Sequence, residues 1–284
     1  MRVLVTGSAG MLAQALLPAL ERAGHETLGI DLADADITRP GSLRHAVRHF
    51  PPDWIFHLAA FTRVDDCESR PDMAFRANAL GSRNVAETAA DCGAAILAIS
   101  TDYVFDGTGR LPYREYDTAN PQSVYGASKW GGEQGVRDIH PRHTIVRTAW
   151  LYGRGGANFV DTILKKAGAG EALRVVDDQR GSPTWTEDLA PALIRLAEGG
   201  HFGTFHVTNS GDCTWCDFAT HIVRQAGLAV PVEPTTTATL GRPAPRPAYS
   251  VLNNQTFDDL TGARLPHWQD AVDRFLETRR EKAR

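Results

Sequence analysis

Cysteine is scarce in this sequence: four residues among 284 are too few for a disulfide-stapled secreted scaffold. No apolar run approaches the ~20 residues that a membrane-spanning helix requires. The first residues predict a β-strand, which leaves no place for the charged and apolar regions of a signal peptide. We therefore expect a cytoplasmic protein with no membrane partner.

The chain also has no large excess of one charge: it contains 30 Lys and Arg and 34 Asp and Glu residues, which give a net charge of −4. Without a basic block, binding to a nucleic acid has no electrostatic support. The 42% hydrophobic and 23% charged content excludes a disordered or low-complexity chain. A globular protein of one large or two unequal domains is what these numbers allow.

Strand-like and helix-like segments alternate through the first half of the chain. The β-rich runs are 2–6, 27–31, 54–60, 94–100 and 144–148. Helical patterns cover 11–23, 40–50, 71–93 and 125–138, with Thr38 as the expected cap of the second. This alternation predicts an α/β fold, a doubly wound parallel sheet covered on both faces. A terminal helix is expected from Trp268 to about Arg280.

A glycine loop connects the first strand to the first helix. Gly7 and Gly10, with the small residue Ala13 three positions later, permit a tight turn and the close approach of a pyrophosphate to the helix N-terminus. The order of strand, loop and helix is what this motif requires, so we expect a nicotinamide dinucleotide here. We therefore assign residues 1–150 to a Rossmann-type dinucleotide-binding domain. Residues 151–284 then form a smaller C-terminal substrate-binding region, partly interleaved with the first.

Asp31 ends the second strand, close to the position at which an acid binds the adenosine ribose. A carboxylate there repels the 2′-phosphate of NADPH, and the neighbours Leu32 and Ala33 carry no compensating positive charge. The sequence therefore predicts that NADH is accepted at least as well as NADPH. Asp36 and Ile37 are expected to flank the adenine.

Three further residues form a pattern typical of ketone reduction. Thr101 follows a buried strand, and Tyr125 and Lys129 are four residues apart, on one face of a predicted helix. A phenol with its ordinary pKa near 10 exchanges protons poorly at neutral pH, and a neighbouring ammonium lowers that pKa. We expect Tyr125 to give a proton to a substrate oxygen that Thr101 also binds, while NADH or NADPH reduces the carbon.

These motifs together resemble the extended short-chain dehydrogenase/reductases, and among them most closely the branch that reduces dTDP-4-dehydrorhamnose to dTDP-L-rhamnose. The resemblance runs over nearly the whole chain. The segments that carry it are 5–13, 59–66, 100–107, 124–129, 147–153, 178–184 and 246–253. It implies a dTDP-4-keto-6-deoxy sugar as substrate.

The resemblance also implies roles for single residues. Tyr125 is the expected proton donor, Lys129 binds the nicotinamide ribose, and Thr101 polarises the ketone. The substrate contacts that it adds are Asp102 and Trp150. The cofactor contacts that it implies are Gly10, Met11 and Leu12 at the phosphates and Ala60, Phe61 and Thr62 along the dinucleotide. Phe61 stands where many relatives carry His, and a homodimer with bound Mg²⁺ is known for some relatives.

Alternative functions remain open at this stage. One is reduction of another nucleotide-linked 4-keto sugar, as in dihydrostreptose synthesis. Another is a non-catalytic NAD(P)-binding regulatory subunit, like the β subunit of methionine adenosyltransferase, although the intact trio of Thr101, Tyr125 and Lys129 argues against it. Related dehydratases carry Asp-Glu after the Thr, whereas this chain has Asp102 and Tyr103, which favours simple reduction.

Two other clusters have competing interpretations. Cys213 and Cys216 have the spacing of a metal or redox pair, but no second ligand pair accompanies them, so we expect Thr214 to cap a helix there instead. No metal ligands are assigned. Arg242 and Arg246 lie in a Pro-rich loop and either face the substrate diphosphate, which suits the guanidinium fork, or are solvated.

Overall fold

The computed structural model describes residues 1–283, and the side chains of residues 1–280, of the chain. A six-stranded parallel sheet forms its centre, in the order β10-β5-β4-β3-β1-β2. The strands are β1 (Arg2–Thr6), β2 (Glu26–Ile30), β3 (Trp54–His57), β4 (Ala95–Thr101), β5 (His143–Thr148) and β10 (Gly203–His206). The order reverses between β1 and β3, which confirms the Rossmann-type α/β fold.

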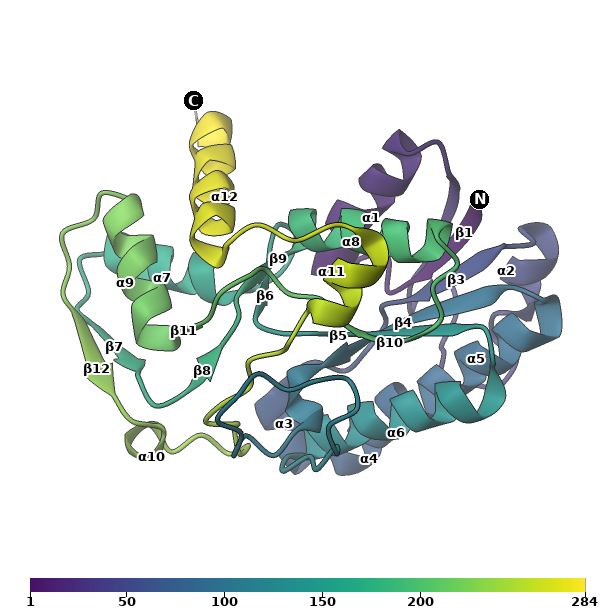
Figure 1. Cartoon of the computed structure of the whole chain (residues 1–284), viewed down its shortest axis with the longest axis horizontal. Helices are drawn as coiled ribbons and strands as arrows, with labels where there is room; N and C mark the ends of the chain where they lie inside the picture. The colour runs from purple at the N-terminus through teal and green to yellow at the C-terminus, as the bar shows by residue number, and fades with distance from the viewer. Residues whose placement is uncertain (284) are drawn as a thin grey trace.

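Helices cover both faces of this sheet (Figure 1). On one face, α1 (Met11–Arg22) and α8 (Thr186–Glu198) pack with apolar side chains of β1, β3 and β4. On the other face, α2 (Arg44–His49), α5 (Gly81–Cys92) and α6 (Val124–Ile139) bury a second apolar cluster. Because both faces are covered, the strands are apolar on both sides, as the continuous run 94–99 indicated.

Several boundaries differ from the predicted ones. The strand predicted over 54–60 ends at His57, because the chain leaves the sheet there. The second helix starts at Arg44 rather than Pro40, so Thr38 is not its cap; the Thr38 hydroxyl donates to Asp36 instead, at 2.8 Å. The helix predicted over 71–93 is α4 (Pro71–Phe75), a π-helical turn η1 (Arg76–Leu80) and α5 in succession.

The second half of the chain contributes to two regions. It supplies α8 and the edge strand β10 to the central layers, and it also builds a separate apolar cluster. The helices of that cluster are α7 (Phe159–Gly168), α9 (Trp215–Gln225) and α12 (Trp268–Ala283). The short strand pairs beside them are β7 (Leu173–Val176) with β12 (Val232–Thr235), β6 (Leu151–Tyr152) with β9 (Thr184–Trp185), and β8 (Arg180–Gly181) with β11 (Cys213–Thr214).

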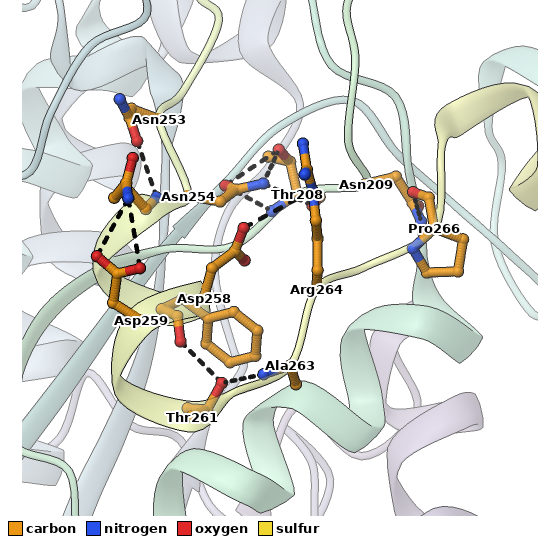
Figure 2. A network of polar contacts seen from close by, with 12 residues as sticks. Thr208, Asn209, Asn253, Asn254, Asp258, Asp259, Thr261, Ala263, Arg264 and Pro266 are labelled. Atoms are coloured by element: carbon orange, nitrogen blue, oxygen red, sulfur yellow. Dashed lines mark hydrogen bonds and ion pairs between the residues drawn. The ribbon is translucent and has the colours of Figure 1, made fainter.

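The remaining elements are short: α3 (Val64–Ser69), the 3₁₀ turn η2 (Asp102–Val104), α10 (Thr237–Leu240) and α11 (Gln255–Thr261). Figure 2 shows how α11 is attached beside β10. The Asn254 amide donates to the carbonyl of Thr208 at 2.9 Å, and the Asn209 amide donates to the carbonyl of Pro266 at 3.1 Å. These hydrogen bonds tie the segment that follows β10 to the segments on either side of α11. None of the helices in the described part of the chain is long and apolar enough to cross a bilayer.

Candidate active site

A cleft of about 800 Å³ opens at the carboxyl ends of the strands, where the strand order reverses. Ligands of open α/β sheets bind at this position. The loops after β1, β3 and β4 line it, together with the first turns of α6 and the segment after β5. Nearly all of the residues selected from the sequence lie here. They are Gly7, Gly10, Met11, Leu12, Asp31, Asp36, Ile37, Ala60, Thr62, Thr101, Asp102, Tyr125, Lys129 and Trp150.

The glycine loop has the geometry needed for a close approach of backbone to ligand. Gly7 has φ +74°, and a Cβ on it would lie 2.7 Å from the backbone nitrogen of Ala59. Gly10 is the N-cap of α1 and supplies no side-chain cap, so the first N–H groups of that helix stay free to bind an anion. The residues present therefore fit a dinucleotide pyrophosphate.

Asp31 lines the same cleft. Its carboxylate accepts hydrogen bonds from the N–H groups of Ala9 and Leu32, each at 2.8 Å. These bonds fix the carboxylate beside the glycine loop, where a ribose hydroxyl would be within reach. Asp36 and Ile37, predicted to flank the adenine, line the cleft next to Asp31.

Phe61 is placed differently from its neighbours Ala60 and Thr62 and does not line the cleft. Its N–H donates to the Asn78 side chain at 2.7 Å, and the Asn78 amide donates back to its carbonyl at 3.0 Å. Asn78 lies in the π-helical turn and also donates to Ser128, at 2.9 Å. Phe61 thus holds the cleft wall against α6 through its backbone.

Thr101 and Tyr125 meet at the centre of the cleft. The Thr101 hydroxyl donates to the Asp102 carboxylate at 3.0 Å and accepts from the N–H of Tyr103 at 3.2 Å. Desolvation raises the pKa of Tyr125 above its ordinary value, and a hydrogen bond with Thr101 opposes that rise only in part. The sequence argument, in which Lys129 lowers this pKa, is therefore wrong for the structure described. The phenol is held protonated, which is the state a proton donor needs.

Lys129 lies one helical turn beyond Tyr125 and is buried. Its ammonium donates to the carbonyl oxygen of Ile99 at 2.7 Å. Burial lowers the pKa of Lys129 to about 8, although the nearby Glu133 carboxylate opposes this. The hydrogen bond to Ile99, a residue of β4, holds the ammonium in the cleft, which Ile99 and Lys129 both line.

Asp102 is the other buried acid of the cleft. One carboxylate oxygen accepts from Thr101, and the second has no hydrogen-bond partner among the described residues. Burial raises the pKa of Asp102 to about 6, in spite of its hydrogen bonds. A buried polar atom without a partner in a binding cleft is a position where a ligand hydroxyl fits.

A buried ion-pair network, centred on Glu133, joins the elements that carry Thr101, Tyr125 and Lys129. The Glu133 carboxylate, on α6, accepts from Arg147 at 2.9 and 2.8 Å, from Arg137 at 2.7 Å and from the Ser100 hydroxyl at 2.5 Å. Burial alone raises the pKa of Glu133, but the Arg147 pair outweighs it and the net shift is downward. This network links the helix of Tyr125 to the strand that ends at Thr101.

Trp150 lines the cleft together with Trp215, the first residue of α9. Its ring stacks on Trp215 with 3.5 Å between centroids and 8° between planes. Trp150 has φ +48°, a strained conformation for a side chain of this size. A Cβ at position 181 would lie 2.6 Å from the Trp150 ring. Only glycine therefore fits at this position of β8 while Trp150 keeps its place. No pattern in the sequence distinguishes the half-buried Trp215 from the buried Trp54, Trp185 and Trp268.

A second cavity of about 340 Å³ adjoins the cleft, because Tyr103 and Trp215 line both. Its charged lining residues are Lys166, Arg174, Arg242 and Arg246, and none of the described residues that line it is acidic. Arg246, selected as a substrate residue, therefore belongs to this second cavity and not to the main cleft. Its guanidinium forms a fork with the Asp65 carboxylate, with distances of 2.9 and 3.0 Å.

The helix cap expected between Cys213 and Cys216 is present. Thr214 caps α9 by accepting from Asp217, and the Asp217 carboxylate accepts in return from the N–H of Thr214. Both cysteines are free and buried. No group of three or more potential metal ligands occurs in the part of the chain that the structure describes.

The family described as the RmlD substrate binding domain matches residues 1–281. The chain belongs to this family. Its RmlD-type relatives include the spore coat polysaccharide biosynthesis protein SpsK of Bacillus subtilis, 44% identical over 278 residues that make up 98% of each chain. A dTDP-4-dehydrorhamnose reductase of Streptomyces griseus is 41% identical over 95% of this chain and 91% of its own.

A solved structure supports the same placement within the RmlD family. The dTDP-4-dehydrorhamnose reductase from Bacillus anthracis, in complex with NADP, superposes with a TM-score of 0.94 at 38% identity, covering 98% of this chain and 99% of that one. The resemblance inferred from the motifs is therefore confirmed.

Proposed function

We propose that this protein is an NAD(P)H-dependent oxidoreductase that reduces the 4-keto group of a dTDP-4-dehydro-6-deoxy sugar, converting dTDP-4-dehydrorhamnose to dTDP-L-rhamnose. The observation that carries the proposal is the meeting of Thr101, Tyr125 and Lys129 in one cleft with the glycine loop. A non-catalytic binding subunit has no need of a desolvated phenol, ammonium and hydroxyl in contact with that cleft.

Each residue has a defined task in this reaction. When bound, the nicotinamide cofactor supplies the hydride that the carbonyl carbon accepts. Tyr125 and Thr101 would bind the ketone oxygen, and Tyr125 gives it the phenolic proton. Lys129, whose ammonium the Ile99 carbonyl holds in the same cleft, would bind the nicotinamide ribose. Asp102 offers its unpartnered oxygen to a sugar hydroxyl.

The nucleotide half of the substrate fits the second cavity. A diphosphate carries negative charge, and the cavity is lined by four cationic side chains and no described acid. Its lining also includes the aromatic side chains of Tyr103, Phe159 and Trp215, which suit a flat base. Tyr103 and Trp215 lie where the cavity joins the cleft, so a nucleotide in the cavity would present its sugar to Tyr125.

The proposal also covers the choice of cofactor, the use of a metal and the cell compartment. Asp31 supports NADH use beside NADPH. A homodimer with Mg²⁺ stays a prediction. The four free cysteines suit a reducing compartment, and we place the protein in the cytoplasm.

The test is oxidation of NADH and NADPH at 340 nm with dTDP-4-dehydrorhamnose generated in situ. Sugar-dependent loss of absorbance with dTDP-L-rhamnose as product would support the proposal. If both cofactors bind and neither is consumed, the substrate assignment is wrong, and other 4-keto sugars, including the dihydrostreptose precursor, are tested next. If none of them is reduced, the non-catalytic alternative is favoured.

A further inference from the structure

Asp65 contacts several groups of a loop that is remote in sequence. It lies on α3 and accepts from both terminal nitrogens of Arg246, from the N–H of Ala244 at 3.2 Å and from Arg242 at 3.5 Å. Asp65 is 181 residues from Arg246 in the chain. In Figure 1 the chain leaves α10 and runs toward α3 before this contact is made.

The same loop is fixed at its other end. The N–H and hydroxyl of Thr237 both donate to the Asp178 carboxylate, at distances of 2.7 to 3.0 Å. Between these two anchors, Leu240 and Arg242 line the second cavity, and Arg246 lines it at the second anchor. The 237–246 loop therefore forms one wall of that cavity, and two aspartates hold it in place.

The Asp65 fork uses only part of the Arg246 guanidinium. One terminal nitrogen donates to Asp65 and to the carbonyl of Ala244, at 2.9 Å each, and the other donates to Asp65 once. A guanidinium has five N–H groups. The N–H on Nε and one on the second terminal nitrogen remain for a ligand in the cavity that Arg246 lines.

Asp65 also lies next to the cofactor cleft. Thr62, just before α3, and Val64, its first residue, line that cleft, and Asp65 follows Val64. The short helix α3 thus lines the cofactor cleft with Val64, and with Asp65 it holds the wall of the second cavity.

We propose that Asp65 is a positioning residue for substrate binding: its carboxylate orients Arg246 and the 237–246 loop so that they bind the diphosphate of the nucleotide sugar. This inference rests on the proposed function. Asp65 does not line either cavity, so it acts through Arg246 and touches no reacting atom.

The experiment compares Asp65→Asn with the wild type and with Asp66→Asn. Asp66 is on the same helix, but it pairs with Arg63 one turn away. Loss of a hydrogen bond to a charged group predicts a rise of about ten-fold in the KM for the dTDP-sugar and in the Kd for dTDP in Asp65→Asn. Its kcat and its Kd for NADPH stay within about two-fold of the wild type, and Asp66→Asn leaves all four values unchanged.

A double-mutant cycle identifies the partner. If Asp65 acts through Arg246, Asp65→Asn adds no further increase in KM to an Arg246→Gln variant. An equal increase in both backgrounds overturns the proposal. A lower KM in Asp65→Asn also overturns it, because Asp65 would then withhold Arg246 from the substrate. A parallel loss of NADPH binding overturns it too, because Asp65 would then have a general structural role.

The wild-type result separates this inference from the proposed function. If the wild type does not turn over any dTDP-4-keto sugar, the proposed function fails. If the wild type is active and Asp65→Asn has the same KM and the same dTDP affinity, only the positioning role fails.

Discussion

The rings of Trp150 and Trp215 lie face to face, 3.5 Å between centroids, and both line the cleft that contains Tyr125. Trp215 also lines the cationic cavity, and its indole N–H donates to Gln179 at 3.1 Å. The stack therefore joins the segment after β5 to α9 at the point where the two cavities meet.

Removal of this stack will weaken substrate binding. We expect Trp215→Ala to raise the KM for the dTDP-sugar by about ten-fold, since an aromatic pair is worth about 0.5–1.5 kcal/mol beyond its buried area. Trp215→Phe keeps a ring in place and will have a smaller effect. Steady-state kinetics at saturating NADPH measures both. A Trp215→Ala enzyme with an unchanged KM would show that Trp215 is only core.

Removal of the Tyr125 hydroxyl will stop the reaction and leave cofactor binding intact. We expect Tyr125→Phe to lower kcat by a factor of about 10²–10⁴, the usual contribution of a proton donor. NADPH affinity, measured by fluorescence titration, stays near the wild-type value because the glycine loop is untouched. Retained turnover in this variant would contradict the assigned mechanism.

The rate of reduction will fall in alkaline solution because of Lys129. Its pKa is lowered to about 8, so its positive charge is lost as the pH rises through that value. The pKa of Tyr125 is raised, so Tyr125 keeps its proton over the same range. We expect kcat/KM for reduction to decline above about pH 8 in the wild type, and Lys129→Arg to lack this decline. A wild-type profile that stays flat well above that pH would refute the assignment.

Asp31 will govern the choice between the two cofactors. Replacing its carboxylate by a neutral amide in Asp31→Asn removes a like charge from the position of a 2′-phosphate. We expect the ratio of kcat/KM for NADPH to that for NADH to rise by about ten-fold. Asp34→Asn is the matched control, because Asp34 accepts from the N–H of Asp31 at 2.9 Å and does not line the cleft. Equal ratios in the two variants would exclude a role for Asp31.

Loss of the Glu133 charge will destabilise the fold. Glu133→Gln leaves the buried Arg147 without its counter-charge, and we expect the free energy of unfolding to drop by about 3–5 kcal/mol. The exposed pair of Arg83 and Glu87 is the control, and Glu87→Gln should cost under about 0.5 kcal/mol. Urea denaturation followed by circular dichroism measures both.

The pH dependence of this effect has a defined sign. Glu133 has a folded-state pKa below its ordinary value of 4.5, so its contribution is fully present above that value. It is lost as the pH falls through the folded-state pKa. The difference in the free energy of unfolding between the wild type and Glu133→Gln should therefore become smaller in acid. A difference that does not change with pH would exclude the Glu133 charge as its source.

Local patterns in the sequence account for the sheet, the glycine loop and the trio. Strands 2–6 and 144–148 are predicted correctly at both ends or within one residue, because each is a short run of β-favouring residues around a buried apolar centre. Tyr125 and Lys129 share a helix face because the helical period places them there. The limits of local patterns show at Thr38, which has the chemistry of a cap but bonds Asp36 instead.

The tertiary structure decided which distant residues meet. No periodicity relates Trp150 to Trp215, or Asp65 to Arg246, because these contacts depend on how the C-terminal region packs against the sheet. The direction of the Tyr125 pKa also depends on packing, since desolvation by the surrounding chain outweighs the hydrogen bond with Thr101. The sequence by itself determined the fold class and the positions of the glycine loop and of the proposed reacting groups, because each rests on residues within one or two elements. The second cavity, with Arg246 in its wall, exists only when segments 181 residues apart are folded together.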